Sequence, residues 1–291
     1  MKENKNFIVK ESLSNPVVFN AFFEEAKFCA SFLNSTGLFN IEEDSIIIEK
    51  TIIEEGINFK TSNMDVKIKI DDYMYINMEM QNQNPKYDMM SRLNFYLGRT
   101  ISRSQPKGKG YKNSYSIVIA IFNFTMFKGD NEYIREFLLR DKNGNEIEYT
   151  KIIVVELTKK QYCDKKELRE WLELFNEKNL NYLKEASGIM NDAAKKIVEL
   201  NSDDEIMLIL DAYERYNRDR AAELEAAIEE GLEKGRTVGM AEGRAQGIAQ
   251  GIAQGETKAT LEVAKNMKSY GMSIEVIIEI TKLDRKIVEE L

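Results

Sequence analysis

The stretch MDVKIKIDDYMYINMEMQ, residues 64–81, alternates apolar and polar side chains in two runs that are separated by Asp71 and Asp72. Strict alternation is typical of strands that are buried on one face, because successive side chains of a strand point to opposite sides. The stretch therefore predicts a β-hairpin with one apolar and one polar face. The apolar face would carry Val66, Ile68, Ile70, Ile76, Met78 and Met80, and the polar face Asp65, Lys67, Asn77, Glu79 and Gln81.

Patterns on either side of the hairpin predict an α/β or α+β layer architecture. Residues 16–33 and 85–105 place apolar side chains at helical spacing, which predicts one helix in each range. Residues 114–127 form a nearly continuous apolar run, which is typical of a central strand covered on both faces. Further strand-like runs occupy residues 44–53, 134–140 and 151–157, with a turn expected at residues 142–145.

The chain is expected to be helical from about Lys165 almost to its end. We predict two domains, an α/β domain over residues 1–200 and a helical tail over residues 201–291 that finishes in two short helices. Within the tail, glycine recurs at every fourth position from 231 to 255. Each helical glycine costs about 1 kcal/mol relative to alanine, so close contact with a second helix is expected to compensate. The alternative is a partly frayed spacer that arose by duplication, as the repeat GIAQGIAQ indicates.

The composition excludes several classes of catalytic site. The chain has no histidine and two cysteines, Cys29 and Cys163, so Ser-His-Asp and Cys-His sites, histidine-bearing zinc sites and a disulfide framework are excluded. An enzyme of this composition works with carboxylates, amides, lysines or tyrosines. Neither a signal peptide nor a stretch of about 20 apolar residues is recognisable, which predicts a cytoplasmic protein without membrane contact.

Charge is unevenly distributed along the chain. The net charge is -8, of which residues 201–291 contribute -7, with 19 acids against 12 bases. Residues 89–128 contain no acid at all. Basic side chains without nearby acids are suited to bind the phosphate backbone of a nucleic acid. The candidate contacts are Arg92, Arg99, Arg103, Lys107, Lys109 and Lys112.

The polar face of the hairpin could carry chemistry. Pairing of the two strands would bring Asp65 and Glu79 together, and two carboxylates from adjacent strands are suited to a hard cation such as Mg²⁺ or Mn²⁺. Gln81 would place an amide on the same face, where it could orient water or contact a phosphate. The alternative is that this face is only the solvated side of an amphipathic hairpin. In either case neither carboxylate is expected to fill the core.

These residues occur in an order that resembles a known family. Asp65-Val66, then Glu79-Met80-Gln81, Arg92 and Tyr96, followed by the segment QPKGKGY at 105–111, are similar to the recombination-promoting nuclease and putative transposase family of the PD-(D/E)XK superfamily. The resemblance implies a restriction-endonuclease-like core with a mixed sheet flanked by helices and followed by a long helical tail. It also implies that Asp65 and Glu79 bind Mg²⁺, or Mn²⁺ or Ca²⁺, and that Gln81 replaces the superfamily's lysine.

The first predicted helix departs from the family pattern. Family members often have an Asp shortly before a Phe-Lys pair, whereas this chain has Asn15 and then Phe19-Asn20. Glu24 and Glu25 on the same helix could supply an additional carboxylate to the metal.

The expected function is that of a metal-dependent DNA endonuclease, linked to recombination, mobile elements or defence, which forms a homo-oligomer through its tail. The alternative is a catalytically inactive module that binds nucleic acid or oligomerises. Cleavage of RNA also stays open, because nothing in the basic stretch distinguishes a 2′-hydroxyl.

Overall fold

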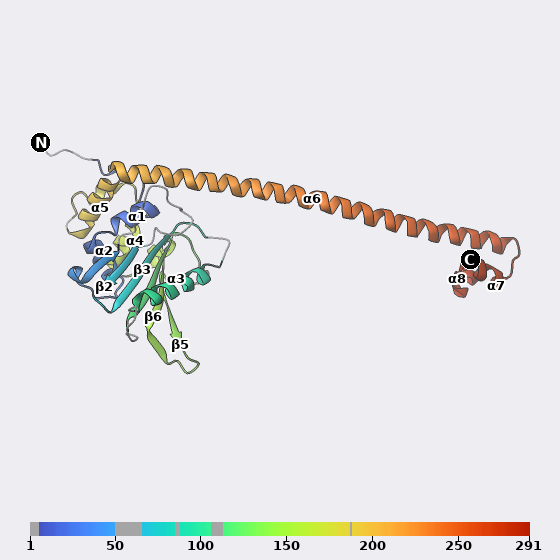
Figure 1. Cartoon of the computed structure of the whole chain (residues 1–291), viewed down its shortest axis with the longest axis horizontal. Coiled ribbons are helices and arrows are strands. Elements are labelled where there is room, and N and C mark those ends of the chain that lie inside the picture. Colours follow the sequence, from blue (N-terminus) through green and yellow to red (C-terminus); the bar gives the residue numbers. More distant parts are fainter. Residues whose placement is uncertain (1–5, 50–65, 85–87, 106–112, 187) are drawn as a thin grey trace. The chain divides into compact units, whose positions relative to one another are not determined.

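A mixed sheet forms the centre of the first part of the chain (Figure 1). The computed structural model describes residues 6–49, 66–84, 88–105, 113–186 and 188–291. Within these residues the sheet has six strands in the order β1-β2-β3-β4-β6-β5. The two central pairs, β3 with β4 and β4 with β6, are parallel, and the outer pairs are antiparallel. The strands are β1 Ile46–Glu49, β2 Val66–Ile70, β3 Met74–Gln81, β4 Tyr115–Phe122, β5 Ile134–Arg140 and β6 Glu146–Glu156.

The predicted hairpin is confirmed as β2 and β3. Val66 pairs with Met78 and Ile70 with Met74, so both strands direct their apolar side chains to the same face. Asp71 adopts the left-handed backbone conformation in the turn, at φ 46°. Asp65 lies outside the described residues, directly before Val66.

Helices cover both faces of the sheet. On one face, α1 Pro16–Phe22, α2 Ala26–Ser35, α4 Lys166–Leu174 and α5 Ile189–Leu200 contribute to the main hydrophobic core with the apolar side of β3. On the other face, α3 Met89–Ser104 packs over β3, β4 and β6. Strand β4 is buried on both sides, as its continuous apolar sequence predicts. Short 3-10 helices occupy Glu43–Ser45, Leu157–Tyr162 and Leu180–Leu183.

The single helix predicted over residues 16–33 is wrong, because the structure has two helices there. Helix α1 ends at Phe22, and Glu25 is extended before α2 begins. The break lets consecutive aromatic rings enter one core from different directions. Phe22 stacks on Phe28, with ring centroids 4.3 Å apart, and contacts Phe23 edge-on. Packing of these rings favours the break over a continuous helix.

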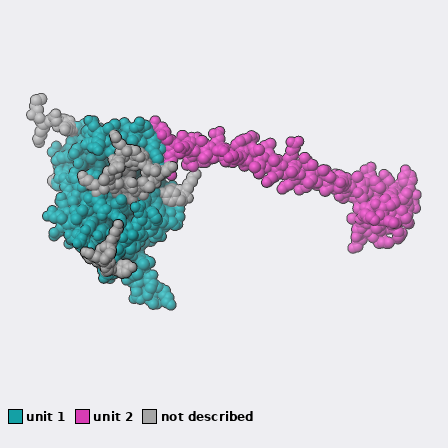
Figure 2. All heavy atoms as spheres, viewed as in Figure 1, with its two compact units in different colours: residues 1–217 teal, residues 218–291 magenta. Residues whose placement is uncertain are grey.

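The remaining helices are α6 Asp204–Ser269, α7 Ile274–Thr281 and α8 Arg285–Glu290. The chain divides into two compact units, Met1–Asn217 and Arg218–Leu291 (Figure 2). Leu210, near the start of α6, is fully buried in the main core of the first unit. The domain boundary after residue 200 stays a prediction, and a fragment that ended there would lack Leu210 from its core.

The end of the second unit is a small helical cluster, which confirms the predicted pair of short terminal helices. Ala264, Ile277 and Val288 form its buried centre. Lys268 of α6 donates hydrogen bonds to the carbonyl oxygens of Val288 and Glu289, at 3.0 and 2.9 Å. These bonds satisfy carbonyl groups at the end of α8 that have no partner within the helix. Among the described residues, none of the helices combines the length and apolar character needed to cross a bilayer.

Candidate active site

Glu79 lies on the face of β3 that α3 covers. Its side chain and that of Asn77 are almost fully buried, with exposures of 3% and 4%. The alternative interpretation, in which this face is only the solvated side of the hairpin, is therefore wrong for these two residues. The reason is packing, since Leu93 and Tyr96 anchor α3 over β4 and β6 next to them.

Arg92 of α3 holds the Glu79 carboxylate in place. Its guanidinium forms an ion pair with Glu79 Oε1, and its Nε donates a hydrogen bond to the Tyr96 hydroxyl at 3.1 Å. The Arg92 side chain is 25% exposed, so the pair links a buried carboxylate to the surface. A buried carboxylate is costly unless it is paired, and Arg92 supplies the compensating charge. In this structure Arg92 contacts Glu79 and Tyr96, and its predicted contact with substrate stays a prediction.

Gln81 ends β3 on the same face as Glu79, because the two residues are separated by one position in a strand. Its side chain is partly exposed and donates a hydrogen bond to the Gln83 carbonyl oxygen at 3.3 Å. The Glu79 carboxylate and the Gln81 amide are both oxygen donors, which fits a hard divalent cation. Within the described part of the chain, no group of three acidic or cysteine side chains forms a metal site.

Glu24 and Glu25, expected on one helix, lie instead between α1 and α2, two helices of the layer opposite α3. Glu25 forms ion pairs with Lys196 of α5 and with Lys27, at 3.0 and 3.1 Å. Partial burial opposes ionisation of Glu25, but the two lysines outweigh it and lower its pKa below the ordinary value. Glu24 is exposed. Asn15, which stands where the family often has Asp, caps α1 by accepting a hydrogen bond from the Val17 amide at 2.9 Å.

Three arginines of the acid-free stretch lie on α3. Arg92, Arg99 and Arg103 fall within about 40° of one another around the helix. Arg103 forms an ion pair with Glu49 of β1, and Arg99 lies over the Phe95 ring at 5.9 Å. Although residues 89–128 contain no acid, two of the arginines on α3 form ion pairs with acids of the sheet, because β1 and β3 place Glu49 and Glu79 beside α3. Lys107, Lys109 and Lys112 lie outside the described residues.

Sequence reasoning missed a buried ion network at the end of β6. Glu156 is 1% exposed and accepts hydrogen bonds from the Met126 and Phe127 amides, at 2.6 and 3.2 Å. Lys159 pairs with Glu156 at 2.8 Å and with Asp130 at 3.0 Å. The network anchors the segment between β4 and β5 to the sheet. The spacing of Glu156 and Lys159 by three residues was the available signal, and it is too common to be specific.

The network predicts an acid-sensitive contribution to stability. The Lys159 ammonium, followed by the Glu132 amide and Arg135, lowers the pKa of Asp130 to about 2. A carboxylate whose pKa falls on folding stabilises the protein above its unfolded pKa of about 4 and loses this contribution as the pH falls toward about 2. We expect Asp130→Asn to flatten the decrease in unfolding free energy over this range, measured by urea denaturation. Asp44→Asn, at an exposed position, is the matched control, and equal pH profiles of the two variants would contradict the assignment.

Sequence reasoning also missed an amide cluster next to Gln81. The Asn123 amide donates to Asn82 Oδ1 at 3.1 Å and to Asn176 Oδ1 at 3.0 Å. Asn82 in turn donates to the Ser14 carbonyl oxygen at 2.7 Å. These bonds connect the carboxyl ends of β3 and β4 to residues near α1 and α4. They hold the strand end that carries Gln81.

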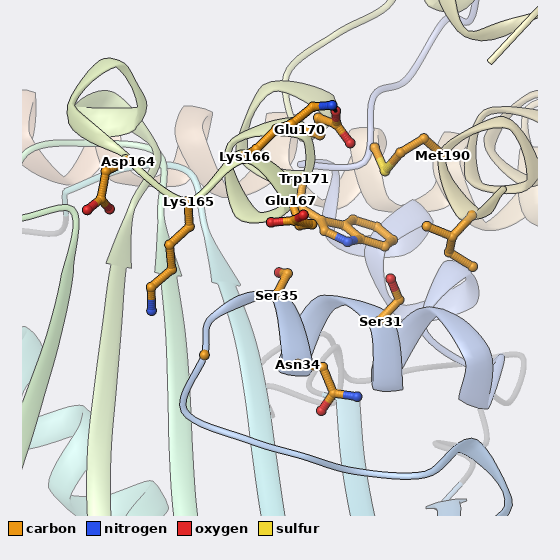
Figure 3. Close-up of a pocket in the computed structure, with 12 residues that line it drawn as sticks. Ser31, Asn34, Ser35, Asp164, Lys165, Lys166, Glu167, Glu170, Trp171 and Met190 are labelled. Atoms are coloured by element: carbon orange, nitrogen blue, oxygen red, sulfur yellow. Dashed lines mark ion pairs between the residues drawn. The ribbon is translucent and has the colours of Figure 1, made fainter. Parts of the chain in front are cut away.

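A pocket of about 670 Å³ lies elsewhere in the first unit, between α2, α4 and α5 (Figure 3). Trp171 and Met190 line it together with charged side chains such as Lys166 and Glu170. Its helices belong to the layer on the sheet face opposite α3, and none of the predicted site residues lines it. The pocket is therefore separate from Glu79.

Most of the chain matches one known protein family. Residues 18–227 match the family described as PD-(D/E)XK nuclease family transposase. The matched range includes Asp65, Glu79, Gln81 and Arg92. Neither the curated proteins nor the solved structures include a match to the chain.

Proposed function

Because the chain belongs to the PD-(D/E)XK nuclease transposase family, we propose that it is a divalent-metal-dependent endonuclease that hydrolyses phosphodiester bonds of DNA. The observation that carries the proposal is the buried Glu79 carboxylate, which Arg92 holds on the face of β3 that also bears Gln81. Burial of a carboxylate is unfavourable and its ion pair with Arg92 serves to offset that cost, so a chemical role explains Glu79 better than packing does.

Asp65 and Glu79 are the proposed ligands of Mg²⁺, with Mn²⁺ or Ca²⁺ as alternatives. Asp65 directly precedes Val66 of β2 in the sequence, and Glu79 directly follows Met78, the residue of β3 that pairs with Val66. When bound, the cation would polarise the phosphate, lower the pKa of a water molecule and stabilise charge on the leaving oxygen.

The side chains around Glu79 have distinct proposed roles. Arg92 fixes the direction of the Glu79 carboxylate through the ion pair between them. Gln81 positions water or a phosphate oxygen through its amide, which is partly exposed. The amide cluster of Asn82, Asn123 and Asn176 limits motion of the strand end that carries Gln81.

DNA is the proposed substrate. Arg99 and Arg103 on α3, with Lys107, Lys109 and Lys112 after it, would contact backbone phosphates and position the duplex without reading its sequence. Recombination, mobile-element movement and defence are the biological settings that fit such an activity.

We also propose that α6 joins copies of the chain. Every residue of 217–259 is exposed, and a Cβ atom built on any glycine from 231 to 255 meets no atom within 4 Å. Four of the seven glycines are followed at the next position by an exposed apolar residue, namely Leu232, Met240, Ile248 and Ile252, and the other three by Arg236, Arg244 and Glu256. A helix that carries seven glycines and several exposed apolar side chains beside them gains stability by packing against a second copy.

Incubation with supercoiled plasmid DNA tests the activity. We expect nicked or linear products with Mg²⁺ or Mn²⁺ and none with a chelator, because the reaction depends on the cation. Gel electrophoresis over time measures the products, and RNA of the same sequence is assayed in parallel. Binding without cleavage in any of these metals would favour the alternative, an inactive nucleic-acid-binding module.

A further inference from the structure

The outer side of α3 carries an exposed aromatic ring among small and basic side chains. Phe95 is 62% exposed, although it lies within a helix whose opposite side is buried in the core. Its neighbours on the helix surface are Ser91, Gly98 and Ser102, all exposed, and the Arg99 guanidinium lies 5.9 Å from its ring centroid. A single exposed ring is common on protein surfaces, but Phe95 differs from the others in standing beside both a helical glycine and an arginine.

We propose that this surface, formed by Phe95, Gly98 and Arg99, binds unpaired nucleotides, with a base stacked on Phe95 and an adjacent phosphate at Arg99. The proposal rests on the proposed nuclease function and names its substrate class. It places single-stranded or locally opened DNA on the helix that also supplies Arg92 to Glu79.

Charge on α3 favours a polyanion over a protein partner. Helix α3 contains no acidic residue, and its other two arginines, Arg92 and Arg103, form ion pairs with Glu79 and Glu49 of the sheet. Within the described part of the chain, no acidic side chain forms an ion pair with Arg99. Arg99 therefore retains its charge for a phosphate, and it stands one helical turn from Phe95.

Gly98 supports close approach of a ligand to the helix. A glycine within a helix costs about 1 kcal/mol relative to alanine, and a Cβ atom at Gly98 would meet nothing within 4 Å. The first unit therefore gives no steric reason for glycine at this position. A nucleotide lying against the backbone beside Phe95 would supply one.

Unpaired bases suit Phe95 better than an intact duplex. The flat faces of bases in a duplex are covered by their neighbours, whereas those of an unpaired strand are accessible to an aromatic side chain. Stacking of this kind tolerates any base, so the surface would hold DNA without sequence preference.

Binding of labelled oligonucleotides in the presence of chelator tests the proposal, because no cleavage occurs. Fluorescence anisotropy should show that Phe95→Ala weakens binding of a single strand about tenfold and of the matching duplex by less than about twofold. Gly98→Ala should also weaken single-strand binding while raising helix stability. Tyr182→Ala, which removes a ring of similar exposure, 58%, from the opposite helical layer, is the matched control.

A second variant reports stacking directly. Trp171 is the chain's only tryptophan and is buried, so Phe95→Trp adds one exposed fluorophore. Its emission should be quenched by a saturating single strand, with affinity retained. Unchanged emission, equal losses for Phe95→Ala and Tyr182→Ala, or equal losses for single strand and duplex would overturn the proposal.

The outcome is distinguishable from failure of the nuclease assignment. If the chain cleaves DNA but Phe95→Ala does not change binding, the proposed nucleotide-binding surface is wrong and the proposed nuclease function stands. If Phe95→Ala selectively weakens single-strand binding but the parent chain does not cleave DNA, the nucleotide-binding surface stands and the proposed nuclease function is wrong.

Discussion

Glu79→Gln is expected to lower metal-dependent DNA cleavage by more than about 100-fold while the chain still folds. Substitutions of residues that merely orient a metal ligand cost 10- to 100-fold, so neutralising a proposed ligand should cost more. Glutamine keeps the volume and a hydrogen-bonding oxygen for Arg92 in a site where Glu79 is 3% exposed. Plasmid cleavage rates in Mg²⁺ measure the effect, and circular dichroism checks the fold.

Glutamine is preferable to alanine because of this burial. Alanine at position 79 would leave a cavity under α3 and an Arg92 guanidinium without its carboxylate, so lost activity could reflect lost structure.

Glu136→Gln is the matched control, since Glu136 forms an ion pair with Lys151 at 3.0 Å toward the far edge of the same sheet. Asp65→Asn should behave like Glu79→Gln, and Gln81→Ala should be milder because it removes no charge. Cleavage by Glu79→Gln at the parent rate would mean that the metal site lies elsewhere.

Removal of residues 218–291 is expected to convert an oligomer into a monomer, as measured by light scattering at micromolar concentration. The cut follows Asn217, where the first compact unit ends. A cut after Leu200, at the predicted domain boundary, would also remove Leu210 from the main core and would confuse dissociation with unfolding. A full-length chain that is monomeric would refute self-association and favour the spacer interpretation.

A triple substitution tests whether the glycines form the contact. We expect replacement of Gly239, Gly243 and Gly247 by alanine to weaken association, although each change favours the isolated helix by about 1 kcal/mol. Residues four apart are rotated by about 40° around a helix, so one partner faces only a few consecutive glycines. The control replaces Gln246, Gln250 and Gln254 by alanine and leaves the glycine row intact. Stronger association of the glycine variant would contradict the close-contact interpretation.

The local sequence of this protein determines its strands and their faces. Alternation over residues 64–81 predicts the hairpin of β2 and β3, and the continuous apolar run of β4 predicts burial on both sides. These predictions succeed because side-chain direction in a strand depends only on position along the chain. The seven regularly spaced glycines and the short terminal helices are also readable locally, through helical periodicity and capping residues.

Burial and pairing of charged groups depend instead on contacts between distant segments. Periodicity places Glu79 on a polar face, but the packing of α3 turns that face into an interior. An acid-free stretch looks unpaired in sequence, yet Arg92 and Arg103 meet Glu79 and Glu49 from other strands. The break between α1 and α2 likewise follows from the aromatic core that Phe22 and Phe28 share. These features depend on which surfaces meet in three dimensions, because burial and ion pairing are properties of neighbours in space and not of neighbours in sequence.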